Sequence, residues 1–262
     1  MSSWDKIVSL LENHYDAFLQ GLLSTLILAI VGTVVGLILG ILLALLRNIK
    51  IKETDNLFIR IIKKIITILS SIYINFFRGT PMMVQAMIIF FGSQLIGINW
   101  SSIVGYSIFN GTFLCGLFVI TINTAAYMAE IIRSGMNAID DGQLEASRSL
   151  GMSYPKAIIK VIMPQAIKNS LPTILNEYII NVKDSSVLNV IGLTELYASV
   201  SIATNKNYFK VEGYIIIAII YLILTLLSSL LLKLVENKLN GKKMKKIELF
   251  RHYKPKEVLE VL

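Results

Sequence analysis

The chain has 262 residues, of which 55% are hydrophobic and 16% are charged, and its formal net charge is +8. A soluble domain of this length is less apolar and carries more charge, so the composition favours an integral membrane protein. The single cysteine, Cys115, excludes a disulfide within the chain, and two histidines at opposite ends, His14 and His252, exclude a histidine cluster. We therefore expect no metal site.

Five stretches are long and apolar enough to cross a membrane, which takes roughly 20 residues of helix. They extend over about residues 18–46, 65–98, 111–132, 166–193 and 214–234. The second stretch has polar residues near its middle and could hold a broken helix. The sequence thus predicts an all-α membrane domain over residues 18–237, between an extracytoplasmic segment at 1–17 and a basic cytoplasmic tail at 238–262.

Basic residues alternate between the connecting segments. Six follow the first stretch, five follow the third and nine follow the fifth, whereas residues 97–110 carry no charge. Lysine and arginine gather on the cytoplasmic side of membrane proteins. The pattern predicts about five transmembrane helices with the N-terminus outside and the C-terminus in the cytoplasm. The positive charge is then a topology signal, and we expect no nucleic-acid partner.

The first stretch contains Gly32, Gly36 and Gly40, spaced four residues apart. They share one helix face, where small residues let a second helix approach closely. The spacing predicts tight helix packing, either within the chain or against a partner chain.

The segment over residues 140–172 is the most informative part of the sequence. Asp140 or Asp141 can cap a helix, and Gly151 suits the left-handed residue that ends one. Pro155 fits the first turn of a second helix. The segment therefore predicts two short helices at an angle on the cytoplasmic side. These helices could form a projecting docking surface for a cytoplasmic partner, or they could pack only against the rest of the chain.

Four separated motifs, in register along the chain, resemble one family. The chain is similar to the permeases of ATP-binding-cassette importers for polar amino acids, which include histidine, glutamine, arginine and cystine permeases. The motifs are residues 76–81 with Gln85, residues 126–133, residues 142–146 with 150–151 and 163–166, and residues 183–186 with 191–192 and 195–196. The chain departs from the family pattern at Ser147, where many members have alanine, and at Ser185, where threonine is common.

The resemblance implies a type I importer permease fold in the bacterial cytoplasmic membrane, crossed several times, with a cytoplasmic coupling helix in the loop at about 140–163. Such a permease pairs with itself or a sibling. It binds two cytoplasmic ATPase subunits and receives substrate from an extracytoplasmic amino-acid-binding protein. This chain lacks a phosphate-binding glycine loop of the Walker type. We therefore expect no cofactor and no enzymatic activity in it, with ATP and magnesium held by the partner ATPase.

Two groups of residues are candidates for function. The resemblance assigns ATPase coupling to Gly142, Glu145, Ala146 and Gly151. Ionisable and polar residues at membrane depth are costly, which makes them candidates for the substrate path. These are Arg78, Thr80, Gln85, Glu130, Asn181, Asp184 and Ser185. Gly79 is a further candidate, because a glycine there would loosen the helix and leave backbone groups available to a ligand. The charged ones could instead pair internally, Lys183 with Asp184 or Glu130 with Arg133.

Other functions fit the sequence less well. A secondary transporter would have more spans and an internal repeat, and a membrane enzyme would need a catalytic set that the spans lack. Within the importers, the substrate could be another small solute, such as methionine or an opine-like compound.

Overall fold

The computed structural model describes residues 2–51, 53–103 and 109–239, and in these residues every regular element is helical. The main helices are α1 (Ser3–Arg47), α2 (Leu57–Gly79), α3 (Met82–Gly92), α4 (Gly111–Asn137), α5 (Asp141–Ser149), α6 (Tyr154–Ala157), α7 (Met163–Asp184), α8 (Leu196–Asn207) and α9 (Lys210–Leu239). Short 3₁₀ segments η1 (Ser93–Ile96), η2 (Trp100–Ser102) and η4 (Ser185–Ile191) and a π-helical turn η3 (Ile158–Ile162) complete the elements. The basic tail predicted at 238–262 lies almost wholly outside the described residues.

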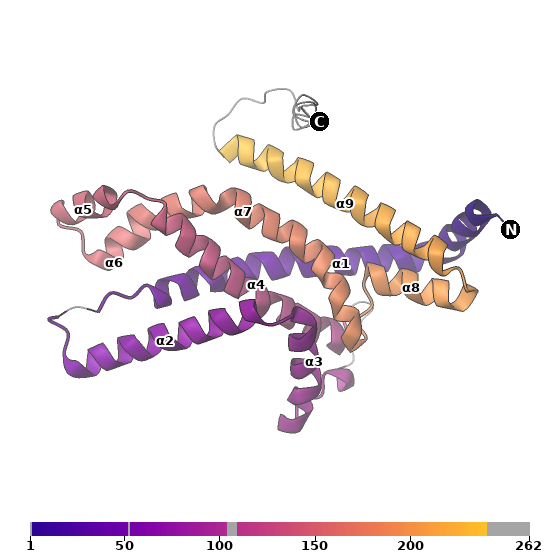
Figure 1. The fold of residues 1–262 in the computed structure, drawn as a ribbon, viewed down its shortest axis with the longest axis horizontal. Coiled ribbons are helices and arrows are strands. Elements are labelled where there is room, and N and C mark those ends of the chain that lie inside the picture. Colours follow the sequence, from indigo (N-terminus) through magenta and orange to yellow (C-terminus); the bar gives the residue numbers. More distant parts are fainter. Residues whose placement is uncertain (1, 52, 104–108, 240–262) are drawn as a thin grey trace, which may run out of the picture.

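Helices α1, α4 and α7 form the centre of the bundle, with α2, α3 and α9 around them (Figure 1). The glycine stripe of α1 lies directly against α4. A Cβ atom at Gly36 would lie 2.8 Å from the Thr124 side chain, and one at Gly40 would clash with Met128. The predicted close packing is confirmed, and it is packing within the chain.

The second apolar stretch is broken, as its polar centre suggested. Helix α2 ends at Gly79, and α3 begins at Met82 and turns sharply away (Figure 1). Pro81 lies between them in an extended conformation. Proline has no N–H to continue the helical hydrogen bonds, and it disfavours helical geometry in the residue before it. Thr80 is accordingly extended.

The fourth stretch is more complex than a single span. Helix α7 continues through η4 to Gly192, and then α8 turns by 53° relative to the preceding helix. By length and composition α1, α4 and α9 can each cross a membrane alone, and the bent pair counts as a fourth when it is taken as one span. The second stretch, split into α2 and α3, accounts for the fifth apolar region that the sequence indicates.

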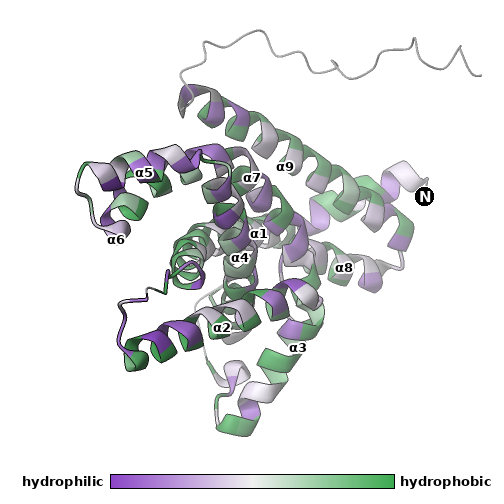
Figure 2. Cartoon of the chain, turned by 60° about the vertical axis from the view of Figure 1, so that its left-hand side comes forward, coloured by the Kyte–Doolittle hydropathy of each residue, from purple (hydrophilic) through white to green (hydrophobic). Residues whose placement is uncertain are grey.

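Hydrophobic residues extend along the long helices, while hydrophilic residues gather near α5 and along α7 (Figure 2). On α2 and α9 most large hydrophobic residues are exposed, including Phe58, Leu69, Leu222 and Leu231. Such surface is stable when it contacts lipid or a second membrane protein.

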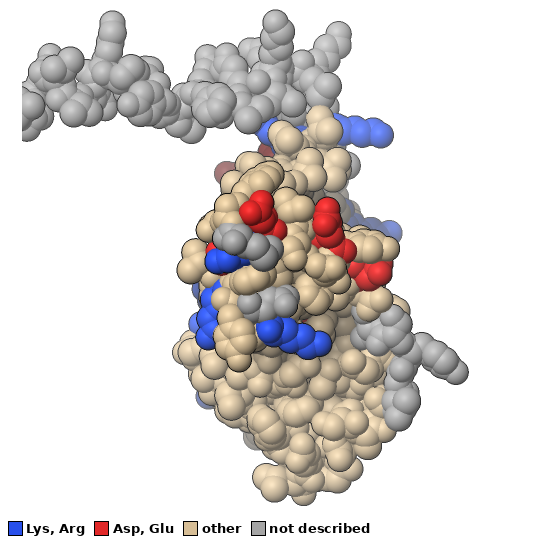
Figure 3. Space-filling view, turned by 90° about the vertical axis from the view of Figure 1, so that its right-hand side faces the viewer, with Lys and Arg blue, Asp and Glu red and all other residues tan. Residues whose placement is uncertain are grey.

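Residues 3–17, predicted as a separate extracytoplasmic segment, form the first turns of the 45-residue helix α1. Leu10 is buried there against α8 and α9, and Lys6 forms an ion pair with Glu212 at 3.1 Å. The outer side of these turns is charged and exposed, with Asp5, Glu12 and Asp16. Viewed from this end of the molecule, charged side chains gather over one half of the face (Figure 3).

Candidate functional site

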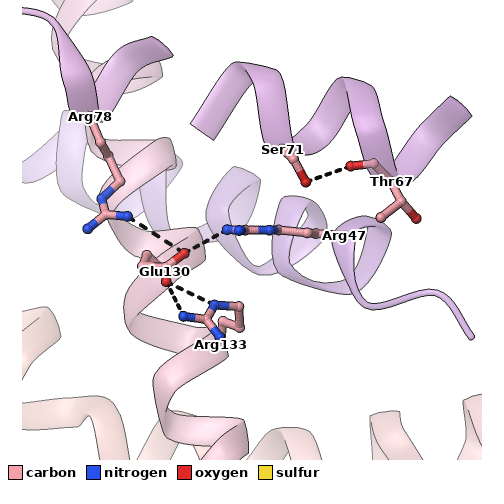
Figure 4. A network of polar contacts seen from close by, with 6 residues as sticks. All are labelled: Arg47, Thr67, Ser71, Arg78, Glu130 and Arg133. Atoms are coloured by element: carbon pink, nitrogen blue, oxygen red, sulfur yellow. Dashed lines mark hydrogen bonds and ion pairs between the residues drawn. The ribbon is translucent and has the colours of Figure 1, made fainter. Parts of the chain in front are cut away.

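The carboxylate of Glu130 lies among three arginines that come from three helices (Figure 4). Arg47, the last residue of α1, donates a hydrogen bond to it at 2.7 Å, and Arg133 donates one from Nε at 2.9 Å. Arg78, near the end of α2, places its guanidinium 3.7 Å from the same carboxylate. The structure therefore pairs Glu130 with Arg133, as one reading of the sequence expected, and adds Arg47 and Arg78.

This cluster borders a polar cavity of about 340 Å³ between α2, α4 and α7. Arg78 and Glu130 line it from one side, and Asn169, Ser170 and Thr173 line it from α7. The Arg78 side chain is 39% exposed. Because its contact with Glu130 is longer than a hydrogen bond, Arg78 can still bind an anionic group that enters the cavity.

Gln85 is predicted from the sequence to lie on the substrate path, but its side chain forms hydrogen bonds at the break between α2 and α3. Its amide nitrogen donates to the carbonyl oxygens of Phe77 and Thr80, both at 2.9 Å, and Asn123 donates to its side-chain oxygen at 2.9 Å. Gln85 is buried and satisfies carbonyl groups that lose their helical partners at Pro81. Next to this network, Gly79 is exposed, with open space where a Cβ atom would be.

Asn181 and Ser185 are also buried inside the helix packing rather than in a cavity. Asn181 donates to Thr33 of α1 at 2.9 Å and accepts from Thr124 of α4 at 3.1 Å, so it joins three helices. The Ser185 hydroxyl donates to the carbonyl of Val182. Both side chains have their polar groups satisfied by the protein.

Two carboxylates of α7 have a different environment. Glu177 is 7% exposed and Asp184 is partly buried, two turns further along the same helix face. Within residues 2–51, 53–103 and 109–239, neither carboxylate has an ion pair or a hydrogen bond to a side chain. Lys183 is exposed and forms no salt bridge with Asp184 there. Its burial without an ion pair in these residues makes Glu177 a further candidate for the substrate path.

Glu195 shows how a buried carboxylate is stabilised in this fold. It is fully buried and caps α8, accepting from the backbone N–H groups of Tyr197 and Ala198. The hydroxyls of Tyr221 and Thr25 donate to it at 2.9 and 3.4 Å. Glu195 therefore ties α1, α8 and α9 together.

The predicted pair of short helices is confirmed as α5 and α6, which project from one end of the bundle (Figure 1). Asp140 caps α5 by accepting from the N–H of Gly142 at 2.8 Å, and Gly151 has the expected left-handed φ of +82°. The projecting helix and turn expose Glu145, Ala146 and Leu150, with Leu150 85% exposed. An apolar side chain at such a position favours contact with another protein.

Comparison with known proteins decides the family. Residues 36–241 match the family described as the inner membrane component of binding-protein-dependent transport systems. The chain belongs to this family. It is therefore a multi-pass membrane component of an importer.

The permease has relatives named for amino-acid transport. It is 38% identical over 178 residues to the arginine transport system permease protein ArtQ of Bacillus subtilis (strain 168), covering 66% of this chain and 75% of the relative. It is 35% identical over 173 residues to the putative glutamine transport system permease protein GlnP of Rickettsia conorii (strain ATCC VR-613 / Malish 7), covering 65% and 74%.

The permease also resembles solved structures. A crystal structure of an amino acid ABC transporter with histidines contains a chain that is 38% identical, with a TM-score of 0.72 over 87% of this chain and 96% of that one. The inward-facing MetNI methionine ABC transporter has a TM-score of 0.60 over 86% and 95% at 20% identity, a likeness of fold alone. The predicted type I importer permease fold is confirmed.

Proposed function

We propose that this permease forms the translocation pathway of an ATP-driven importer for polar amino acids. The relatives given above are named for arginine and glutamine transport, and the similar solved chain comes from an amino acid ABC transporter. The observation that carries the proposal is the polar face of α7. This face holds Asn169, Thr173 and Asn176, all exposed, followed by the buried Glu177 and the partly buried Asp184, which form no ion pair with any residue that the structure describes.

Such a face is costly against lipid, because polar groups in the hydrocarbon region need partners. From Asn169 to Asp184 it extends about 22 Å along the helix. The end at Asn169 borders the cavity that Arg78 lines. A water-filled pathway shared with a second permease, identical or sibling, would keep this face out of lipid. The face therefore supports both a pathway along α7 and pairing of permeases.

The chemistry of the face suits an amino acid. A carboxylate such as Glu177 or Asp184 can bind the substrate's ammonium group or a cationic side chain, and a guanidinium such as Arg78 can bind its carboxylate by two hydrogen bonds. Among the other substrate-path candidates Glu130 lines the cavity beside Arg78, and the buried polar ones support the pathway from within the helix packing. Thr80, Gln85, Asn181 and Ser185 hold the broken helix and the helix junctions, and Glu130 holds Arg78 near the cavity.

The projecting helix α5 would dock on an ATPase subunit. Gly142, Glu145 and Ala146 are exposed on it, and Gly151 follows it. ATP and magnesium would bind to that partner, so this chain would have no enzymatic activity and no cofactor of its own. Closure of two ATPase subunits would switch the paired permeases between an inward-facing and an outward-facing state. The permease pair would then have two stable states, and binding of the ATPase would shift the equilibrium between them. The basic residues place α5 in the cytoplasm, and the binding protein would dock at the opposite end.

The proposal is tested by uptake in proteoliposomes that hold the permease, its ATPase and its binding protein. A panel of labelled arginine, histidine, glutamine, cystine, methionine and octopine is offered with ATP inside or outside. We expect ATP-dependent uptake of one or more polar amino acids. Uptake of methionine or octopine alone, or uptake driven by an ion gradient without ATP, would contradict it. Omitting any sibling permease in a parallel sample shows whether the permease pairs with itself.

A further inference from the structure

A second cavity lies at the end of the bundle that carries α5, away from the face of α7. It has a volume of about 380 Å³ and is enclosed by the end of α1, the first turns of α2 and the segment from α6 into η3. Its walls are mainly aliphatic. They include Leu45, Leu46, Ile49, Met136, Ile158 and Ile159.

The edge of this cavity is basic and aromatic. Lys50 and Lys63 both line it, and the Lys50 ammonium lies 5.0 Å from the centre of the Tyr154 ring, which holds it at the edge. Lys63 donates to Asp55 at 2.6 Å and to the Lys50 carbonyl at 3.5 Å. An ammonium group has three donors. Lys63 therefore keeps one donor free, and Lys50 has no hydrogen-bond acceptor among the described residues.

The cavity also lies where a membrane surface must be. Helix α1, an apolar span, ends at Arg47 beside it, and α2 begins ten residues later. Ile159 in its wall is 57% exposed, and Phe58 in the first turn of α2 is 69% exposed. Six basic residues fall between positions 47 and 64 against two acidic ones. Apolar surface that faces lipid and positive charge that faces the headgroups thus meet at this cavity.

We propose that the cavity binds one anionic phospholipid of the membrane leaflet on the α5 side, with its phosphate at Lys50 and Lys63 and part of an acyl chain against the aliphatic wall. The apolar wall offers nothing to a free phosphate ion, and Asp55 beside Lys63 weakens attraction for a small dianion. An amphiphile with a single negative charge satisfies both the edge and the wall. The inference rests on the family's membrane location and not on the transported substrate.

A bound lipid would connect two parts of the permease that differ in role. Lys50 lies in the α1–α2 connection and Lys63 lies in α2, whereas Tyr154 of α6 and Ile158 of η3 belong to the segment that follows α5. Met152 donates its N–H to Ser147 and its carbonyl accepts from Arg148, so this segment is tied to α5. The lipid would therefore contact the docking segment as well as the spans.

Native mass spectrometry of the purified permease–ATPase complex tests the proposal with dioleoyl phosphatidylglycerol and dioleoyl phosphatidylcholine as probes. We expect retention of phosphatidylglycerol over phosphatidylcholine, and a loss of about fivefold in Lys50→Gln, because one lysine near an anionic surface contributes about that factor. Lys50→Arg should keep retention. Lys64→Gln removes the same charge from the residue directly after Lys63, and Lys64 does not line the cavity, so lipid retention by this variant should equal that of the unaltered chain.

A second measurement needs no variant. Phosphatidylglycerol with a diazirine in its acyl chain is cross-linked to the unaltered complex, and we expect labelled peptides that contain residues 45–49 and 158–159. The proposal is overturned if labelling avoids both peptides, if Lys50→Gln and Lys64→Gln lose lipid equally, or if excess inorganic phosphate displaces the lipid as well as added phosphatidylglycerol does.

Discussion

Arg47 donates a hydrogen bond to Glu130 at 2.7 Å and so fastens the end of α1 to α4. The two residues are 83 positions apart, and Arg78 and Arg133 share the same carboxylate. The cluster has three positive charges and one negative charge. Its stability therefore depends on the single carboxylate more than on any one of the arginines.

Replacing Glu130 by glutamine should destabilise the permease by about 1–3 kcal/mol, because three guanidinium groups would lose the charge that holds them together. Arg47→Gln should cost less, about 1 kcal/mol or below, since the pair is partly exposed. Thermal unfolding in detergent measures both, with Glu12→Gln as an exposed control. Equal losses for Glu130→Gln and Arg47→Gln would contradict this account.

Glu177→Gln should leave stability unchanged or slightly raised, because it removes a buried charge that has no partner in the described residues. Uptake of the transported amino acid should fall about tenfold or more, the effect of losing one charged hydrogen bond to substrate. Uptake and thermal unfolding are measured on the same preparation. A variant that unfolds early would instead show that Glu177 has a structural partner.

Glu195→Gln should have the opposite effect on stability. Four donors converge on the Glu195 carboxylate, and an amide NH₂ group cannot accept from them. We expect a loss of about 1–3 kcal/mol and a lower melting temperature. Tyr221→Phe removes one donor and should cost less. If Glu195→Gln were as stable as Glu177→Gln, the two buried carboxylates would not differ as we describe.

Gly40→Ala should destabilise the permease by about 1–3 kcal/mol, because the added methyl group meets Met128 and the backbone of Ala129. Gly92 is the matched control, since it is also helical and has open space around a Cβ atom. Gly92→Ala should be neutral or slightly stabilising. A similar melting temperature for both variants would rule out the close contact of α1 with α4.

Glu145→Lys should uncouple ATP hydrolysis from uptake while the permease remains folded, because Glu145 is exposed on the projecting helix α5. Glu53→Lys makes the same charge reversal in the α1–α2 connection and should retain coupling. The measurement is ATPase stimulation by the binding protein in proteoliposomes, followed with uptake. Full coupling in both Glu145→Lys and Gly151→Trp would refute docking at this segment.

The sequence predicted the elements that short-range patterns determine. Apolar length predicted the spans, the glycine spacing predicted one helix contact, and Gly151 predicted the end of α5. It could not predict which charges meet, because Arg47 and Glu130 are brought together only by the packing of α1 on α4. Nor could it separate Gln85 and Asn181, whose groups are satisfied, from Glu177, whose carboxylate is not. That distinction depends on neighbours from other helices.

The length of α1 has a mechanical consequence. Its 45 residues form one unbroken helix of about 68 Å, more than twice the hydrocarbon thickness of a bilayer of about 30 Å. A stiff rod of this length that pivots inside the membrane moves its two tips in opposite directions. A push on the tip near Leu10 would therefore displace Arg47 at the other tip, carrying a signal across the bilayer without any change in helix structure.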